Sequence, residues 1–393
     1  MHPADEIRGE KSWDLKDKKI ALCITGSIAA IESFHLCREL IRHGADVIPV
    51  MSETSTKILH PNTMEFASGR KPVLELGGQV EHVKICRNVD LILIAPCTAN
   101  TISKIATGVA DNALTSCVLV AEGSGVPILI APAMHLSMYE SPIIREHVDN
   151  LRKRGFTIID PEIKGESARL AGKEKIIAYV KRTLNGKHLK GKRVLVIGGA
   201  SMEYIDDIRF ISNRSSGKMA ISLATKAFEM GADVELWHGM VTERIPDYIP
   251  SRKFESVKDV FRIIERSKNF DFIIVCAALA NYVPDKFDGK LPSDKDSLTL
   301  KLRKSPYVIE ELRKLNPNGK VIAFKAEKER KDIEKKALDF LNKFNLDLVV
   351  ANTLQAFGSE KSEIWIVSRR ETFYLKGNKK TLAEKILLKL REL

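Results

Sequence analysis

Apolar positions along the first half of the chain form short continuous runs separated by helix-like periodic stretches. The runs do not alternate with polar residues, which is typical of parallel strands buried on both faces of a sheet. Between the first two runs, Leu36, Leu40 and Ile41 mark one face of a helix. The predicted strands are 19–25, 46–50, 90–96 and 127–132. Alternating strands and helices predict right-handed βαβ units and an α/β fold with a doubly wound sheet.

The same pattern restarts near residue 190. A helix over 173–184 is followed by the polar, basic segment 185–192, and a second series of strands and helices then begins. Its predicted elements are strands at 193–197, 233–237 and 271–277 and a helix at 218–230, with two short strands and a final helix over 363–393. We therefore predict an N-terminal tail (1–18), a first domain (19–186) and a second domain (187–393), each domain Rossmann-like.

Composition and charge exclude several classes of protein. Of 393 residues, 44% are apolar and 29% charged, which is a globular composition. No apolar run approaches the roughly 18 residues of a membrane span, and the first residues are charged, so we expect no membrane contact and a cytoplasmic location. Six cysteines without a C-x-x-C pair argue against zinc ribbons and disulfide frameworks. A net charge of +12 without nucleic-acid-binding motifs favours a lysine-rich surface or phosphorylated ligands over nucleic acid.

Polar residues gather where predicted strands of the first half end. Gly26 permits a tight turn after the first strand, and Ser27 can donate to a phosphate at the positive end of the next helix. A helix cap explains this turn equally well, and the G-x-G-x-x-G fingerprint is absent. Thr98, Asn100 and Thr101 follow the third strand, at the usual ligand crevice of α/β sheets. A cap needs one such residue, so three of them indicate ligand contacts.

Two further features of the first half are ambiguous when each is considered alone. Met134 and Met138 are four residues apart, a spacing that is more often part of a core than a cofactor wall. His82 lies between apolar neighbours, where a histidine is usually structural.

Taken together, these motifs resemble the homo-oligomeric flavin-containing cysteine decarboxylases over about residues 17–180, most specifically in 95–114. The resemblance implies a flavodoxin-like domain that binds FMN at a subunit interface of a trimer-based assembly, with a dodecamer as a larger alternative. Its matching FMN-binding residues are Gly26, Ser27, Ile28, Ser52, Thr98, Ala99, Asn100, Thr101 and Met134. In this family, flavin oxidation of the substrate thiol gives the carbanion left by CO2 loss a sink.

The same resemblance implies roles for two histidines. His82 matches the catalytic histidine, which acts in proton transfer. His135 replaces an asparagine of the family that holds the substrate carboxylate, and a histidine can still donate a hydrogen bond there. The flap segment 165–172 lacks the family's cysteine, so the final proton donor is unassigned.

The second half contains a run of hydrogen-bond donors at the start of a predicted helix. Arg209, Asn213, Ser215 and Ser216 could converge with backbone amides on a phosphate or carboxylate. A helix start accounts for one or two of these residues, not for all of them.

This run resembles phosphopantothenate–cysteine ligases over about 188–370. Further matching segments are 198–199, 276–282, 289–291, 324–327, 347–352 and 357–359. The resemblance implies that the carboxylate of 4′-phosphopantothenate attacks a nucleotide, usually CTP, and that the amine of L-cysteine attacks the acyl-nucleotide. Mg2+ or another divalent cation would neutralise the triphosphate. The matching catalytic residues are Arg209, Asn213 and Lys290; those of the nucleotide site are Cys276, Ala277, Asn281, Lys290, Ser305, Pro306, Tyr307, Val308, Phe324, Lys325 and Lys343.

This half departs from the ligase pattern at three positions. Asn281 stands where the family usually has aspartate, which leaves Asn281 a doubtful metal or cytosine contact. Phe340 and Phe344 align with two lysines of the family, for which Lys325 and Lys343 are candidate substitutes. ATP stays open as an alternative to CTP.

The two resemblances in one chain predict a bifunctional enzyme of coenzyme A synthesis. It would join 4′-phosphopantothenate to cysteine and decarboxylate the product to 4′-phosphopantetheine. One alternative is a non-catalytic regulator, because decarboxylase relatives include phosphatase-regulating subunits, although the acidic tails common in those relatives are absent. Another is a flavin-dependent prenyl or other-substrate enzyme that uses only the first fold, against which the ligase-like half argues.

Overall fold

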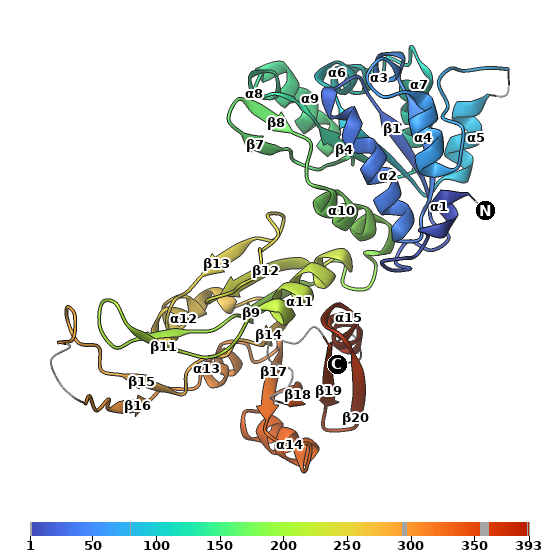
Figure 1. The fold of residues 1–393 in the computed structure, drawn as a ribbon. Coiled ribbons are helices and arrows are strands. Elements are labelled where there is room, and N and C mark those ends of the chain that lie inside the picture. Colours follow the sequence, from blue (N-terminus) through green and yellow to red (C-terminus); the bar gives the residue numbers. More distant parts are fainter. Residues whose placement is uncertain (1, 79, 293–296, 354–360, 391, 393) are drawn as a thin grey trace. The chain divides into compact units, whose positions relative to one another are not determined.

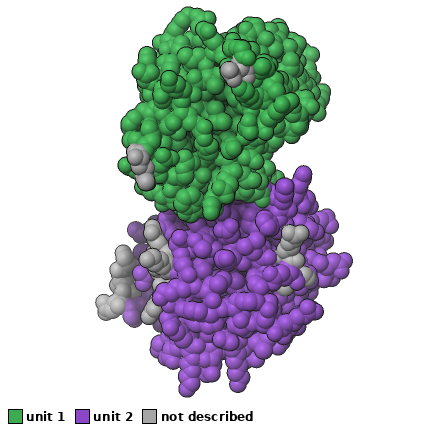
Figure 2. Space-filling model, turned by 90° about the vertical axis from the view of Figure 1, so that its right-hand side faces the viewer, with its two compact units in different colours: residues 1–185 green, residues 186–393 purple. Residues whose placement is uncertain are grey.

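A computed structural model describes residues 2–78, 80–292, 297–353, 361–390 and 392. The chain forms two compact units, residues 1–185 and 186–393, coloured separately in Figure 2. The sequence motif at 357–359 lies outside the described residues. In the part of the chain described, no helix is long and apolar enough to cross a membrane.

Unit 1 is built on a five-stranded sheet in the order β2-β1-β3-β4-β6, in which all neighbouring strands are parallel (Figure 1). This is the doubly wound, flavodoxin-like order. The strands are β1 (Lys19–Ile24), β2 (Asp46–Met51), β3 (Leu91–Cys97), β4 (Ile128–Pro132) and β6 (Thr157–Ile158). A small sheet adds β5 (Met134–His135), β7 (Glu162–Lys164) and β8 (Ser167–Arg169).

Helices cover both faces of this sheet. They are α1 (Pro3–Glu6), η1 (Ile28–Ile31), α2 (Glu32–Arg42), α3 (Glu53–Thr56), α4 (Pro61–Ser68), α5 (Glu81–Asn88), α6 (Ala99–Thr107), α7 (Ala113–Gly123), α8 (Leu136–Tyr139), α9 (Pro142–Lys153) and α10 (Lys173–Asn185). Successive residues of β1 enter different cores, because side chains alternate along a strand. Leu22 packs in the core with Leu36 of α2, whereas Cys23 packs in the core with Ile102 of α6.

The segment before β1, which the sequence analysis treats as a tail, packs onto unit 1. Ala4 and Leu15 are buried in the core that contains α2 and α10. The Arg8 guanidinium also donates a 2.6 Å hydrogen bond to the carbonyl of Ala45. These contacts anchor the segment to the domain.

Unit 2 contains an eight-stranded sheet in the order β13-β12-β9-β14-β17-β18-β19-β20. Strands β13 to β18 are parallel in the Rossmann order, and β19 and β20 extend the sheet antiparallel. The strands are β9 (Arg193–Gly198), β12 (Asp233–His238), β13 (Ser251–Lys253), β14 (Phe272–Val275), β17 (Lys320–Glu327), β18 (Leu348–Thr353), β19 (Lys361–Val367) and β20 (Thr372–Asn378). The predicted fold class is confirmed in both units.

The helices of unit 2 lie on two faces. One core contains residues of α12 (Val257–Ile263), η2 (Ile264–Ser267), α13 (Val308–Leu315) and α14 (Ile333–Lys343) together with alternate residues of the strands. On the other face, α11 (Lys218–Glu229) contacts β9 and β12, and α15 (Lys379–Leu390) contacts β19 and β20.

Two antiparallel ribbons complete unit 2. They are β10 (Met202–Tyr204) with β11 (Phe210–Ser212), and β15 (Tyr282–Pro284) with β16 (Leu302–Lys304). The ribbons contact each other through β10 and β15, on the side of the unit away from α14 (Figure 1). They carry the segments around the predicted residues Arg209 and Lys290.

Candidate functional site

The first candidate site lies at the carboxyl edge of the unit 1 sheet, where the strand order reverses between β1 and β3. Thr25 joins the ends of these two strands: its hydroxyl donates to the Pro96 carbonyl at 2.9 Å and accepts from the Thr98 amide at 3.0 Å. Ligands of open α/β sheets bind at this switch point. The structure thus brings the Gly26 turn and the Thr98 turn to one edge.

Gly26 fits this edge because it has no side chain. A Cβ at this position would lie 2.4 Å from the Thr54 Oγ1, so another residue would force Thr54 to move. Thr54 in turn lies 3.2 Å from the Ser52 hydroxyl. The ends of β1, β2 and β3 therefore form one polar edge with a close approach at Gly26.

The predicted hydroxyl residues at this edge are also helix caps. Ser27, Ser52 and Thr98 each accept a backbone amide hydrogen bond, at 3.4, 3.3 and 3.3 Å. The Ser27 hydroxyl hydrogen has no acceptor among the described residues, so it can donate to a ligand. The side chains of Ile28 and Asn100 are exposed, whereas Ala99 and Thr101 are buried beside Thr98.

Met134 and His135 form β5, which pairs with the flap strand β8. The His135 Nδ1 lies 2.9 Å from the Ser137 hydroxyl, and its Nε2 lies 3.7 Å from a carboxylate oxygen of Glu166. Glu166 belongs to the flap that lacks the expected cysteine. The flap is therefore held against the Met134–His135 segment that follows β4.

His82 lies in the first turn of α5, and its Nδ1 is buried without a hydrogen-bond partner. Within the described part of the chain, no hydrogen bond connects His82 to the Gly26, Ser52 or Thr98 turns. One turn further along α5, the Cys86 thiol donates to the Cys117 carbonyl at 3.1 Å. A buried imidazole nitrogen without a hydrogen-bond partner costs folding free energy, and a bound ligand would provide the missing partner.

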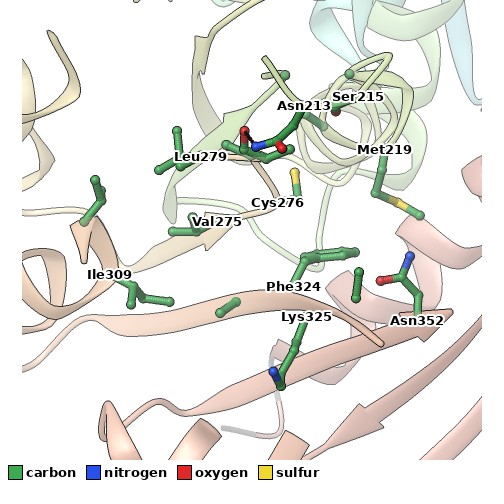
Figure 3. A pocket seen from close by; sticks show the side chains of 18 of the residues that line it. Asn213, Ser215, Met219, Val275, Cys276, Leu279, Ile309, Phe324, Lys325 and Asn352 are labelled. Carbon is green, nitrogen blue, oxygen red and sulfur yellow. Dashed lines mark hydrogen bonds between the residues drawn. The ribbon is translucent and has the colours of Figure 1, made fainter. Parts of the chain in front are cut away.

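The second candidate site is a pocket of about 1440 Å3 in unit 2. It lies at the carboxyl ends of β9, β14, β17 and β18, again where the strand order reverses. Figure 3 shows Asn213 and Ser215 at one side, Phe324 and Asn352 at another, and Cys276 between them. The predicted residues that line the pocket are Asn213, Cys276, Ala277, Asn281, Pro306, Tyr307, Val308, Phe324, Lys325 and Lys343.

Hydrogen bonds connect both the donor-rich run and the turn after β9 to the segment after β14. The Asn213 amide donates to the Ala278 carbonyl at 3.0 Å, and the Ser201 hydroxyl accepts from the Ala280 amide at 3.0 Å. Gly217 starts α11 with a φ of +73°, and no side chain caps the helix. The first amides of α11 therefore remain available at the wall of the pocket.

Every charged side chain in the described lining is cationic: Arg214, Lys218, Lys325, Lys343 and Lys379. Lys218 lies 3.3 Å from Glu243, and Lys325 lies 2.8 Å from Glu327, but neither carboxylate lines the pocket. A concave surface lined by positive charges concentrates anions. The pocket is therefore suited to a polyanionic ligand.

Phe340 and Phe344, which the ligase resemblance aligns with two lysines of that family, provide rings for other lysines of the pocket. The Lys325 ammonium lies 5.1 Å from the Phe340 ring centroid, and the Lys343 ammonium lies 5.1 Å from that of Phe344. Lys343 also lies 5.3 Å from the ring of Tyr307. Cation–π contacts of this length hold both ammonium groups at the pocket wall.

Three predicted residues do not line this pocket. Ser305 is buried, and its amide donates to the Asn281 carbonyl at 2.8 Å. Arg209 lies beside the buried carboxylate of Asp206, which accepts from its guanidinium at 2.7 Å and from the amide of Leu291, the residue after Lys290, at 3.1 Å. Burial alone would raise the pKa of Asp206, but hydrogen bonds from backbone amides and the guanidinium hold it well below its usual range.

Cys276 lines the pocket as a thiol. Burial raises the pKa of Cys276 to about 12, and its Sγ lies 3.4 Å from the Ile197 carbonyl. A thiol with this pKa is not a thiolate nucleophile near neutral pH. Cys276 therefore contributes to the shape and polarity of the pocket wall.

Four residues that line the pocket are not among those predicted from the sequence: Arg214, Lys218, Asn352 and Lys379. Arg214 and Lys218 lie within the donor-rich run, and Asn352 lies within a matching segment, so the motifs contained a signal for these three. Lys379 begins the final helix and belongs to no motif. Only the position of α15 beside α11 brings it to the pocket.

The described residues of the unit 2 pocket offer few ligands for a divalent metal ion. Among the described residues, no group of three or more histidine, cysteine, aspartate or glutamate side chains could hold a metal ion. Asn281 lines the pocket with an exposed amide, and no carboxylate accompanies it among the described lining residues. Residues of the pocket therefore do not form a resident magnesium site.

Comparisons with known proteins agree on both halves. Residues 8–185 match the family model described as Flavoprotein, and residues 189–393 match the DNA/pantothenate metabolism flavoprotein C-terminal domain. A coenzyme A biosynthesis bifunctional protein CoaBC of Thermococcus kodakarensis is 42% identical over 98% of this chain and 98% of its own length. The protein of the same name from Methanocaldococcus jannaschii is 38% identical over 100% and 98%.

A more distant relative has the same name and spans the same length. The CoaBC protein of Borreliella burgdorferi is 35% identical over 95% of this chain and 99% of its own. Both halves are thus matched in one order along whole chains. The chain belongs to the family of the coenzyme A biosynthesis bifunctional proteins CoaBC.

Proposed function

We propose that unit 2 joins 4′-phosphopantothenate to L-cysteine at the expense of CTP, and that unit 1 decarboxylates the product to 4′-phosphopantetheine. The observation that carries the proposal is the unit 2 pocket, in a chain that belongs to this family. The pocket lies where the strand order reverses, and every charged side chain of its described lining is cationic. Both substrates that precede cysteine in the ligation are phosphorylated. A pocket whose described lining includes no carboxylate suits two phosphorylated ligands.

Ligation requires that negative charge on phosphate be neutralised while the carboxylate attacks the α-phosphate. The cations of the pocket and the free amides of α11 are suited to this task. The Asn213 amide, fixed by the Ala278 carbonyl, would orient the acyl-nucleotide for attack by the cysteine amine. Arg209 and Lys290, carried by the two loops that meet at Asp206, would provide positive charge to the triphosphate from outside the pocket lining.

We place Mg2+ with the nucleotide rather than with the protein. Magnesium keeps several waters and commonly binds through substrate phosphates. The described lining contains no carboxylate, and Asn281 offers only a neutral oxygen. The cation would therefore enter as part of the nucleotide complex.

We assign FMN to the edge of unit 1, where Ser27, directly after the Gly26 turn, has a hydroxyl hydrogen to donate to a phosphate. Gly26, Ser27 and Ile28 would hold the phosphate, and Ser52, Thr98, Ala99, Asn100, Thr101 and Met134 would lie along the flavin. Bound FMN supplies the oxidising equivalent that makes the cysteine-derived carboxylate easy to lose. His82 would move the proton, and His135 would hold the carboxylate.

The flavin site is proposed to be completed by a second copy of the chain, in a trimer-based assembly. Within the described residues, His82 is not hydrogen-bonded to the strand-end turns, and Ile28 beside the phosphate turn is 76% exposed. A partner that covers Ile28 could bring its own histidine to the flavin. Light scattering with and without bound FMN measures the assembly.

Two experiments test the proposal. The purified chain should be yellow, and a colourless chain that takes up no FMN on titration contradicts the unit 1 assignment. Incubation with 4′-phosphopantothenate, cysteine and Mg2+ with either CTP or ATP, followed by mass spectrometry, identifies the nucleotide. Absence of phosphopantothenoylcysteine with both nucleotides contradicts the unit 2 assignment.

A further inference from the structure

The cations of the unit 2 pocket include two groups on opposite faces of β17. Lys325 and Lys343 lie on the face of α14, as their contacts with Phe340 and Phe344 show. Phe324 precedes Lys325 in the strand and points the other way, because strand side chains alternate (Figure 3). The other cations that line the pocket are Arg214, in the segment before α11, and the first residues of α11 and α15.

Lys218 and Lys379 are the first residues of α11 and α15, and these helices pack against each other. The packing fixes where both helices begin. The Lys226 ammonium of α11 lies 3.9 Å from the Glu384 carboxylate of α15, and the Asn378 side chain accepts the Thr381 amide at 2.9 Å. Both lysines are therefore set at one wall of the pocket by the fold.

The charges at this wall are not balanced. Lys218 pairs with Glu243 at 3.3 Å, but the Lys379 ammonium forms no hydrogen bond or ion pair with a described residue. Partial burial, and then the nearby positive charge of Lys218, lower the pKa of Lys379, against the opposing effect of Glu243. An anion between the two ammonium groups would offset both effects.

We propose that Lys379 and Lys218 together bind a phosphoryl group of a ligation substrate. This assignment rests on the proposed function, in which both the nucleotide and 4′-phosphopantothenate carry phosphate. An ammonium group is a point charge suited to phosphate oxygens, and two of them can share one phosphoryl group. Glu243, which pairs with Lys218, is not among the described residues that line the pocket.

The test is calorimetric titration of the full chain with CTP and, separately, with 4′-phosphopantothenate. Lys379→Met should weaken one of these ligands about tenfold or more, the usual effect of losing a hydrogen bond to a charged group. The neighbouring Lys380 is exposed and outside the pocket, so Lys380→Met is a matched control that should bind like the wild type.

Unphosphorylated or shortened probes identify the source of the phosphoryl group. If Lys379 serves the nucleotide, the variant loses affinity for CTP but not for cytidine. If it serves the acid, affinity falls for 4′-phosphopantothenate but not for pantothenate. Unchanged affinity of a folded Lys379→Met chain for both phosphorylated ligands overturns the inference.

A pH series provides a second readout that does not depend on the methionine variant. Because the pKa of Lys379 lies below that of an ordinary lysine, phosphate affinity should fall earlier as the pH rises. Lys379→Arg stays protonated and should keep its affinity over that range. Identical pH profiles for wild type and Lys379→Arg contradict the inference. A wild type that binds neither phosphorylated ligand would instead contradict the proposed function itself.

Discussion

At the scale of single residues, the two proposed chemistries depend on side chains in different units. His82 has a buried Nδ1 without a partner, and we expect His82→Asn to lower decarboxylation by about 10²–10⁴-fold, the usual range for losing a general acid or base. Ligation should continue, so phosphopantothenoylcysteine should accumulate. His60→Asn, an exposed histidine that caps α4, is the control. Equal loss of both activities in a folded His82→Asn chain would contradict the separation.

In unit 2, Asn213 is the residue whose replacement tests the proposed ligation chemistry. Asn213→Asp places a negative charge beside a phosphate-bearing intermediate and should slow ligation by about 10²–10³-fold, as does loss of an oriented donor. Acyl-nucleotide should build up and be visible by quenched-flow mass spectrometry. Asn342→Asp, on the exposed face of α14, should leave the rate unchanged. A wild-type ligation rate in Asn213→Asp would show that the donor-rich run serves only as a helix cap.

At the scale of elements, one carboxylate organises the segment that carries Arg209 and Lys290. Asp206→Asn should raise the KM for nucleotide and lower the melting temperature at neutral pH, because hydrogen bonds to the charged carboxylate are lost. The control Asp285→Asn removes only an exposed pair with Arg303. An unchanged KM would show that this loop does not position the nucleotide.

The pH dependence of this effect has a defined sign. The folded pKa of Asp206 is depressed, so its stabilisation is complete above the unfolded pKa of about 4 and is lost as the pH falls through the folded value. The melting temperatures of wild type and Asp206→Asn should therefore converge in acid below about pH 4. A constant difference down to strongly acid pH would contradict this assignment.

Sequence patterns predicted those elements whose burial leaves a local signature. The runs 90–96 and 127–132 are buried on both faces, so β3 and β4 appear in the sequence as unbroken apolar stretches. The position of Lys379 has no such signature, because it depends on β19 and β20 joining the sheet and placing α15 on α11. The packing of Leu15 likewise depends on tertiary contacts and not on local periodicity.

The site was predictable where motifs coincide with strand ends. Asn213, Cys276 and Phe324 lie at one pocket because the carboxyl ends of parallel strands meet at one edge. Local sequence could not indicate that Arg209 and Lys290 lie in two loops joined at Asp206 instead of lining that pocket. Asp206 is distant in sequence from Leu291, the residue after Lys290, and accepts its amide only because the two loops meet in the fold.

At the scale of the whole molecule, the central claim is that one chain performs ligation and then decarboxylation. The most direct measurement follows cysteine labelled with 13C at its carboxyl group, in a mixture with 4′-phosphopantothenate, CTP and Mg2+. The label should appear first in phosphopantothenoylcysteine and then in CO2, with unlabelled 4′-phosphopantetheine as the final product. In His82→Asn it should stop in phosphopantothenoylcysteine. Label that remains in free cysteine, or 13CO2 released without nucleotide, would contradict the account.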